Sequence, residues 1–538
     1  MDHAESLPGD ARALRQGLEQ LLGSDAVLAD PDDRAFYGTD IRGAGAVPAL
    51  VIRPGGPRRL ARALREITDA GFAVLPRGGG VSYTGGFVPN DERSVIVDTQ
   101  GLDRIVDVDV DNMFVTVEAG VTWAALRDAL EGTGLRTPFM GPLSGAQATV
   151  GGSLAQHAIL WGSAGDDASA ASVLSLQVAL ADGTLLDTGS AATDAPPFFR
   201  WFGPDLAGLF LGDAGALGVK TRATLKLSPE AAETRPVSFN FTRRDALSRA
   251  LCAVARSGLA STCFGMDPVL QYQRIKRASL GKGVRALGGV LQHADSTFSG
   301  LRTALRTAVA GRRFIDENGY SLHAIVEGET ARVAHERLGL LRDLLRNEGE
   351  EIPNALPTLL WSNPWVDMSS AVGPDGERWA PMHGVFALTE ADRAWERIEA
   401  LFESYAERFD ALGIVVGYLL ATVSRTAFVV EPVFYWPGPP TPWHERMVPK
   451  ATLRRMPRHA ADPEVERTMN EVRGALVTLF ADLGAAHLQI GRTYSYLGRL
   501  DPGARRLLEA LKTALDPRGL MNPGALGLAT AHRDGLSP

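Results

Sequence analysis

Cysteine is scarce in this sequence of 538 residues, and the two cysteines that occur follow no motif. Ten residues separate Cys252 from Cys263, a spacing that fits neither a CxxC redox pair nor a zinc knuckle. We therefore expect two packed thiols. The HExxH, GxxxxGK(S/T) and GxSxG patterns are missing as well, so the sequence carries no signature of a zinc protease, a P-loop NTPase or a serine hydrolase.

An excess of positive charge and long apolar runs are also absent. The net charge of -8 and the sequence pI of 5.8 provide no electrostatic footprint for nucleic acid or an anionic membrane, so we expect a small-molecule partner. No run approaches the ~20 apolar residues of a membrane helix. The opening MDHAESLPGD lacks a basic and then apolar signal segment. These features predict a cytoplasmic protein without a membrane span.

Strand and helix patterns alternate over the first part of the chain. Residues 48–76 read as strand, helix and strand, and the helix carries Leu60, Leu64 and Ile67 at helical spacing. Residues 104–120 alternate apolar and polar positions with a period of two, which indicates strands with one face exposed to solvent. The pattern predicts an α+β fold.

The sequence pattern changes after about residue 230, where glycine becomes less frequent and a predicted strand followed by a predicted helix recurs. This predicts a second domain made of a sheet with helices on one face. We expect an N-terminal helical segment at 1–45, a first domain at 46–229, a second domain at 230–485 and a C-terminal segment at 486–538.

Glycine is concentrated in three clusters, at 75–86, 141–166 and 208–227, and each cluster adjoins a strand. Glycine serves where φ must be positive or where a ligand touches the main chain. Consecutive amides in such a loop form a concave nest for anionic oxygens. The loop at 77–82 is therefore predicted to bind phosphate, with a purely structural turn as the alternative.

Four segments in order, PRGGGVSYTGG, ATVGGSLAQHA, LFLGDAGALGVKTRATLKL and LDPRGLMNPG, resemble the flavin-binding motifs of the vanillyl-alcohol oxidase and para-cresol methylhydroxylase (PCMH) superfamily. The resemblance implies a PCMH-type FAD-binding domain of two α+β subdomains at 46–229. It also implies an α+β cap domain at 230–485, with an antiparallel sheet and helices on one face, and a segment at 486–538 that completes the FAD site.

Carried over residue by residue, the resemblance assigns contacts to an extended FAD. The pyrophosphate would be held by the backbone amides of Arg77, Gly78, Gly79, Gly80, Val81 and Ser82. The residues along the flavin would be Pro142, Ser144, Thr149, Gly151 and Gly152. Gly215 and Val219 would lie near the adenine side, and Asn522 would close the ring pocket. Covalent members often have a histidine where this chain has Val81, so the resemblance implies non-covalent FAD, with a bond to a histidine or tyrosine of the cap domain as the alternative.

The segments LGDAGALGVKTRATLKL and LDPRGLMNPG look most like the branch of FAD-linked D-lactate, glycolate and D-2-hydroxyglutarate dehydrogenases. The segment GAAHLQIGR (484–492) aligns with a motif of that branch in which a histidine is flanked by glycine, and His487 occupies the histidine position. The metal site of that branch uses an acidic residue before this histidine and a GHxGDGNxH stretch. Neither has a counterpart in this sequence. The resemblance therefore implies no metal.

The branch of phenolic and aromatic alcohol oxidases is the alternative. Its pockets use tyrosines and an arginine, and this chain offers Arg492, Tyr494 and Tyr496. On an alternating strand these three side chains would point to one face.

The first functional hypothesis is oxidation of a small alcohol or 2-hydroxy acid by hydride transfer to flavin N5. His487 would take the hydroxyl proton, Arg492 would anchor a carboxylate or a phenolate, and Tyr494 would be a proton partner or phenol clamp. A core histidine and a plain salt bridge are the alternatives for His487 and Arg492. The second hypothesis is an oxidase of para-substituted phenols or aryl alcohols, and the third is a non-catalytic flavin-binding partner subunit. The electron acceptor would be oxygen, a quinone or a cytochrome, and the resembling family implies a homodimer by analogy.

Overall fold

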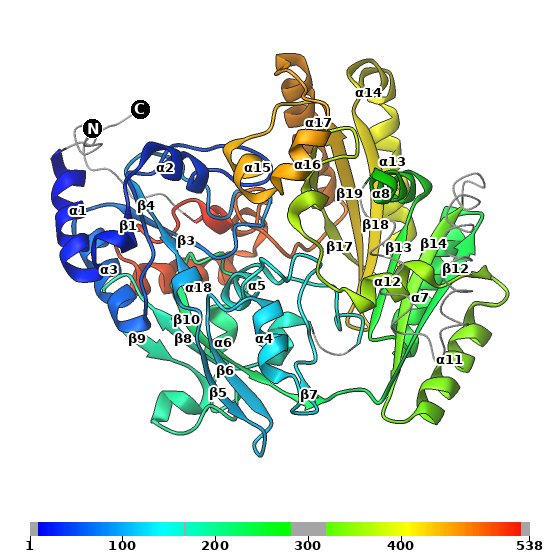
Figure 1. The fold of residues 1–538 in the computed structure, drawn as a ribbon, viewed down its shortest axis with the longest axis horizontal. Helices are drawn as coiled ribbons and strands as arrows, with labels where there is room; N and C mark the ends of the chain where they lie inside the picture. The colour runs from blue at the N-terminus through cyan, green and yellow to red at the C-terminus, as the bar shows by residue number, and fades with distance from the viewer. Residues whose placement is uncertain (1–8, 166–167, 281–318, 529–538) are drawn as a thin grey trace.

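Three main sheets organise the chain in the computed structural model, which describes residues 9–165, 168–280 and 319–528 (Figure 1). The first sheet has the order β1-β2-β4-β3, and β4 pairs in parallel with both β2 and β3. Its strands are β1 (Val27–Leu28), β2 (Leu50–Ile52), β3 (Ala73–Arg77) and β4 (Ser94–Asp98). Its helices are α1 (Gly9–Leu22), α2 (Pro31–Tyr37) and α3 (Pro57–Asp69). Helix α3 connects β2 to β3, and its Leu60, Leu64 and Ile67 are fully buried, as their helical spacing predicts.

The second sheet is antiparallel and has the order β5-β6-β10-β8-β9. Its strands are β5 (Ile105–Asp109), β6 (Phe114–Glu118), β8 (Val173–Ala179), β9 (Leu185–Asp187) and β10 (Val219–Lys226). The helices of this part are α4 (Trp123–Leu130), α5 (Val150–Gln156) and α6 (Leu206–Leu209), and β7 (Leu135–Arg136) pairs with β11 (Ser228–Pro229). The glycine-rich segments 141–166 and 208–227 therefore come before and after β8, a strand of this sheet, in the sequence.

The third sheet is antiparallel and follows the order β15-β12-β14-β13-β18-β19-β16, with β17 paired to β19. Its strands are β12 (Glu233–Phe241), β13 (Thr262–Met266), β14 (Tyr320–Gly328), β15 (Glu350–Ile352), β16 (Arg378–Pro381), β17 (Gly384–Ala387), β18 (Val415–Val423) and β19 (Ala427–Trp436). The helices of this half are α7 (Arg244–Ser257), α8 (Pro268–Leu280), α11 (Ala331–Leu345), α12 (Ala355–Ser362), α13 (Ala391–Glu403), α14 (Ala406–Leu412), α15 (Pro442–Met447), α16 (Lys450–Arg455) and α17 (Pro463–Asp482). This arrangement confirms the predicted α+β fold, and the third sheet is the antiparallel sheet expected after residue 230.

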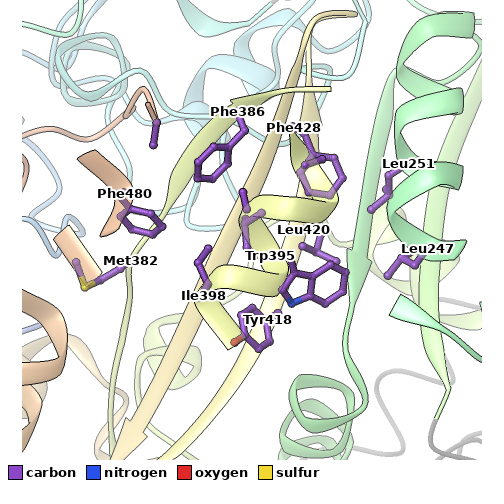
Figure 2. Close-up of a cluster of buried hydrophobic side chains, with 14 of the residues drawn as sticks. Leu247, Leu251, Met382, Phe386, Trp395, Ile398, Tyr418, Leu420, Phe428 and Phe480 are labelled. Carbon is purple, nitrogen blue, oxygen red and sulfur yellow. The ribbon is translucent and has the colours of Figure 1, made fainter. Parts of the chain in front are cut away.

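The two faces of the third sheet pack against different parts of the molecule. On one face Leu420 and Phe428 join the core under α7 and α13, together with Trp395 (Figure 2). The alternate residues of β18 and β19, such as Ala421 and Val429, belong to a separate cluster on the opposite face. Because strand side chains alternate between faces, this second row is available to line a site between the sheets.

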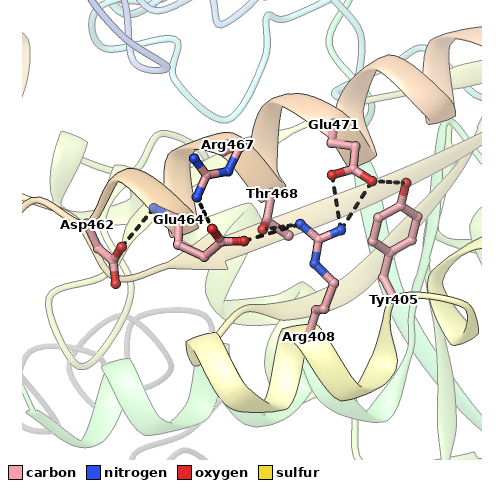
Figure 3. A network of polar contacts seen from close by, with 7 residues as sticks. All are labelled: Tyr405, Arg408, Asp462, Glu464, Arg467, Thr468 and Glu471. Atoms are coloured by element: carbon pink, nitrogen blue, oxygen red, sulfur yellow. Dashed lines mark hydrogen bonds and ion pairs between the residues drawn. The ribbon is translucent and has the colours of Figure 1, made fainter.

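An exposed polar network ties α14 to α17 on the outside of the molecule (Figure 3). Arg408 lies 3.0 Å from a carboxylate oxygen of Glu471, and the Tyr405 hydroxyl donates to the same carboxylate at 3.3 Å. Exposed ion pairs of this kind typically contribute less than about 1 kcal/mol each. The attachment of α17 therefore depends mainly on its buried apolar face.

The last part of the chain returns to the first half of the molecule. Helix α18 (Pro502–Leu515) begins after Asp501, whose carboxylate accepts the amides of Gly503 and Ala504, as is typical of an N-cap residue. The turn that follows it joins the edge of the first sheet, where the amide of Asn522 donates to the carbonyl of Val74.

The segment 491–496 differs from its expected strand. Gly491 has a φ of 53°, and the amides of Thr493 and Tyr494 both donate to the carbonyl of Ile490, so the chain turns here. Tyr494 is buried, whereas Tyr496 is 38% exposed. The three polar side chains of this segment therefore do not share one strand face, and that prediction was wrong.

Candidate functional site

A cavity of about 260 Å³ lies where the three sheets approach one another. Its walls come from the loop after β3, from the segments around α5 and before β10, and from β16, β18 and β19. The predicted cofactor residues that line it are Arg77, Gly78, Gly79, Gly80, Val81, Ser82, Pro142, Ser144, Thr149, Gly151, Gly152, Gly215 and Val219. The structure therefore brings the three glycine clusters of the sequence to one cavity.

The glycine loop presents backbone donors to this cavity. The amides of Gly79, Gly80, Val81 and Ser82 have no acceptor among the described residues. Buried backbone N–H groups are almost always paired, and consecutive free amides form an anion-binding nest. The loop thus fits a ligand that carries phosphate oxygens, such as the pyrophosphate of FAD.

The same glycines also have a packing role that the sequence did not reveal. A Cβ on Gly79 would overlap the carbonyl group of Gln147, and one on Gly78 would overlap the Thr149 hydroxyl. Gly80 has a φ of 67°, a conformation that favours glycine. The bare backbone therefore lets the loop lie directly against residues 147–152, and both segments line the cavity.

A buried guanidinium lies beneath the loop. Arg77 is 2% exposed, and its Cζ lies 4.7, 4.6 and 5.3 Å from the ring centroids of Phe36, Tyr37 and Phe87. Its Nε and Nη2 atoms have no acceptor within the described part of the chain. Burial lowers the pKa of Arg77 from its usual value. A positive charge with unused donors beside the amide nest favours an anionic ligand.

The third sheet contributes a carboxyl group to the opposite part of the cavity. Glu431 lies on β19 in the row of Val429, directly across from Leu419 of β18. Its Oε2 is 3.4 Å from the hydroxyl of Tyr83, which accepts a hydrogen bond of 2.9 Å from the Gln489 amide. Burial raises the pKa of Glu431 to about 7. Sequence reasoning missed this residue, although a single carboxyl within the apolar run AFVVEPVFYW was a visible signal.

His383 adds a hydrogen-bond donor to the cavity wall. Its Nε2 accepts the amide of Leu488 at 3.1 Å, and burial lowers the pKa of His383 to about 3. The neutral ring therefore carries its proton on Nδ1, which has no partner among the residues described. His383 can donate to a ligand oxygen but is poorly suited to accept a proton.

The predicted residues His487 and Tyr494 lie behind His383 and do not line the cavity. Nδ1 of His487 is 2.9 Å from the carbonyl oxygen of His383, and the amide of His383 donates to the Tyr494 hydroxyl at 2.7 Å. The rings of His487 and Tyr494 stack with centroids 3.9 Å apart. Burial lowers the pKa of His487 to about 4 and raises that of Tyr494. Their contacts hold the backbone and ring of His383 in position.

Arg492 and Asn522 brace the glycine loop from outside the cavity lining. Arg492 Nη2 donates to the Asn522 side-chain oxygen at 2.6 Å and to the carbonyl of Pro523 at 2.9 Å. The Asn522 amide donates to the carbonyls of Gly86 and Ala214 at 2.7 and 2.5 Å. Burial lowers the pKa of Arg492 to about 10. These bonds join the C-terminal turn to two of the cavity's glycine-rich segments.

Other groups stay apart from the cavity. Cys252 and Cys263 are buried free thiols, and burial raises the pKa of both. Within the described residues no three His, Cys, Asp or Glu side chains cluster so that they could hold a metal ion. No described helix combines the length and the apolar character needed to cross a membrane.

Comparison with known proteins identifies the glycine-rich half. Residues 48–189 match the FAD binding domain family. An uncharacterized FAD-linked oxidoreductase of Mycobacterium tuberculosis (strain ATCC 25618 / H37Rv) is 28% identical over 305 residues, which are 56% of this chain and 62% of the relative. The D-lactate dehydrogenase of Archaeoglobus fulgidus is 30% identical over 216 residues, 39% of this chain and 45% of that protein. The chain thus spans about three fifths or less of these curated relatives.

The whole fold also has known counterparts. The structure of p-cresol methylhydroxylase with substrate bound covers 98% of both chains at a TM-score of 0.70 and 16% identity. This likeness establishes a PCMH-type fold for the chain.

Proposed function

Because residues 48–189 form an FAD-binding domain within a PCMH-type fold, we propose that the protein is an FAD-dependent oxidoreductase. It oxidises a small alcohol or 2-hydroxy acid, and when bound, FAD supplies the hydride acceptor at flavin N5. The FAD-linked oxidoreductase and D-lactate dehydrogenase relatives support this activity.

The chain's own residues have separate tasks in holding the cofactor. The amides of residues 79–82 and the charge of Arg77 bind the pyrophosphate. The small residues of 142–152 lie along the flavin, and Asn522 secures the turn that closes the site. Val81 provides no group for a covalent bond, which supports a dissociable FAD.

One observation carries the catalytic part of the proposal: the glycine loop, Glu431 and His383 line the same cavity. Oxidation of an alcohol releases a hydride from carbon and a proton from the hydroxyl group, and the proton needs an acceptor. His383 donates to the substrate oxygen through Nδ1 and orients it. His487 and Tyr494 are positioning residues that hold His383.

The apolar side chains of Trp379, Leu419 and Val429 in the cavity wall favour a second candidate, an oxidase of para-substituted phenols or aryl alcohols. For the two candidates together, oxygen, a quinone or a cytochrome would reoxidise the flavin, and a homodimer is the proposed assembly. Oxygen uptake during turnover distinguishes an oxidase from a dehydrogenase.

The visible spectrum of the purified protein, before and after acid precipitation, tests the cofactor. A yellow supernatant is expected, whereas a yellow pellet contradicts dissociable FAD and colourless protein contradicts the whole proposal. Anaerobic titration with D-lactate and with vanillyl alcohol then tests the reaction, since either donor class should bleach the flavin. Bleaching by dithionite alone would instead indicate a flavin-binding partner subunit without turnover.

A further inference from the structure

The inference concerns the carboxyl group of Glu431 and rests on the proposed oxidation. Glu431 is the acidic side chain among the described residues that line the cavity, and its neighbours in the same row of β19 are the apolar Val429 and Val433. A carboxyl group in such a row loses hydration, which is costly without a function or a strong partner.

The partners of Glu431 leave it able to exchange a proton with a ligand. Its carboxyl group accepts a hydrogen bond of 3.4 Å from the Tyr83 hydroxyl, which is longer than a strong bond to a carboxylate. Arg274 of α8 also lines the cavity and attracts Glu431, but burial outweighs both effects and raises the pKa of Glu431 to about 7. Tyr494 also interacts electrostatically with Glu431, and its hydroxyl accepts a hydrogen bond from the amide of His383.

The wall beside Glu431 is aromatic and aliphatic. The ring of Trp379 meets the ring of Tyr83 edge to face with centroids 6.0 Å apart, and Leu419 lies opposite Glu431 across the strands. An aromatic or aliphatic body fits this wall, because apolar surfaces gain free energy when both are removed from water. A substrate carboxylate beside a Glu431 carboxylate would meet a like charge in a desolvated space.

We propose that Glu431 is the catalytic proton acceptor for an uncharged aromatic alcohol, and that its carboxylate selects against substrates that bear a carboxylate. In the reaction the substrate C–H bond breaks and its electron pair leaves as hydride to oxidised FAD. The O–H bond breaks and its proton moves to Glu431, while the C=O bond of the aldehyde product forms. The carboxylate form of Glu431 is needed at the start, so flavin reduction should accelerate as the pH rises through about 7.

Benzyl alcohol and mandelate form a matched pair of probes, because mandelate adds only a carboxylate at the reacting carbon. Anaerobic stopped-flow measurement of flavin bleaching with each probe tests both parts of the proposal. We expect benzyl alcohol to reduce the wild-type flavin at least about tenfold faster than mandelate at equal concentration. Faster reduction by mandelate would overturn the substrate class and favour a carboxylate site at Arg274.

Glu431→Gln tests the proton acceptor. This variant should retain FAD and bind benzyl alcohol, as seen from perturbation of the flavin spectrum, but reduce flavin about 100-fold or more slowly and without the pH dependence. It should also bind mandelate more tightly than the wild type does, because the like charge is gone. Reduction within about tenfold of the wild-type rate, with the same pH profile, would overturn the role of Glu431.

Tyr83→Phe tests the hydrogen bond to Glu431, and Glu399→Gln is the matched control. Because the Tyr83 hydrogen bond lowers the pKa of Glu431, Tyr83→Phe should move the pH midpoint upward, and a downward shift would contradict the assignment. Glu399 is a partly buried carboxyl on α13, which packs on the far face of the same sheet, and its variant should leave the midpoint unchanged. If dithionite but neither probe nor D-lactate bleaches wild-type flavin, the proposed oxidation itself fails, and Glu431 has no such role.

Discussion

The attachment of the C-terminal turn depends on one buried lysine. Lys512 of α18 is 7% exposed, and its Nζ donates at 2.7 Å to the carbonyls of Ala216 and Met521 and to the carboxylate of Asp516. Asp516 is 2% exposed and also accepts the amides of Leu520 and Met521. This ammonium group therefore joins the turn that contains Asn522 to a glycine-rich segment of the cavity.

Lys512→Met removes the ammonium group but keeps most of the side-chain volume. The Asp516 carboxylate would then stay buried without its cation, and breaking a buried ion pair in this way costs about 3–5 kcal/mol. Asp516→Asn added to Lys512→Met removes the unpaired charge, so the double variant should recover part of that loss. The free energy of unfolding follows from urea titration, and the dissociation constant of FAD from fluorescence of the released flavin.

We expect Lys512→Met to lower stability by about 3–5 kcal/mol and to weaken FAD binding, because the turn bearing Asn522 loses its anchor. The control is Arg332→Met, which breaks an exposed i,i+4 pair with Glu336 on α11 and should cost less than about 0.5 kcal/mol. If Lys512→Met costs no more than this control, or if the two substitutions of the buried pair are additive, the argument from buried charge is refuted.

Three further predictions test packing, pH dependence and thiol burial. Gly79→Ala should purify without flavin because its Cβ overlaps the Gln147 carbonyl, whereas Gly474→Ala on α17, whose Cβ has no atom within 4 Å, should stay yellow; equal flavin content per chain would contradict this. The pKa of His487 is lowered to about 4 in the folded protein, so between about pH 6.5 and 4 the unfolded chain binds more protons than the folded chain. The free energy of unfolding should therefore fall with acidification in this range, by up to about 1.4 kcal/mol per pH unit. His487→Gln should make that slope shallower in urea titrations, and an unchanged slope would refute the assignment. Cys252 and Cys263 should resist a thiol reagent such as dithionitrobenzoate at mildly alkaline pH until urea is added, since burial raises both pKa values; rapid labelling of the native protein would contradict their burial.

The sequence was most informative where local chemistry is strongest. The glycine clusters predicted segments that approach one ligand, and residues from all three line a common cavity. The side chains of Thr122 and Asp501 also accept backbone amides of the helices that follow them, because capping depends on neighbouring residues only. Such features need no knowledge of the rest of the fold.

The remaining part of the site depends on contacts between distant residues. Glu431 becomes a candidate catalytic group only when β19 faces the loop that carries Tyr83, a separation of 348 residues. His487 lies in a sequence context that resembles a catalytic histidine. In the structure, however, residues 491–496 form a turn and His487 stacks on Tyr494, so that His383 lines the cavity and His487 does not. Periodicity predicts which residues share a strand, but it cannot predict which strand faces a ligand.

The division of the cavity between sheets implies that cofactor binding and substrate choice can be altered separately. The amide nest and Arg77 belong to the first sheet and its following loop, whereas Glu431 and Trp379 belong to the third sheet. Glu431 contacts the first half mainly through the Tyr83 hydroxyl, whose loop continues from the nest. Substitutions on β19 should therefore change the substrate and the pH profile while FAD is retained. Tyr83 is the position at which both properties should change together, because it joins the nest loop to the carboxyl group.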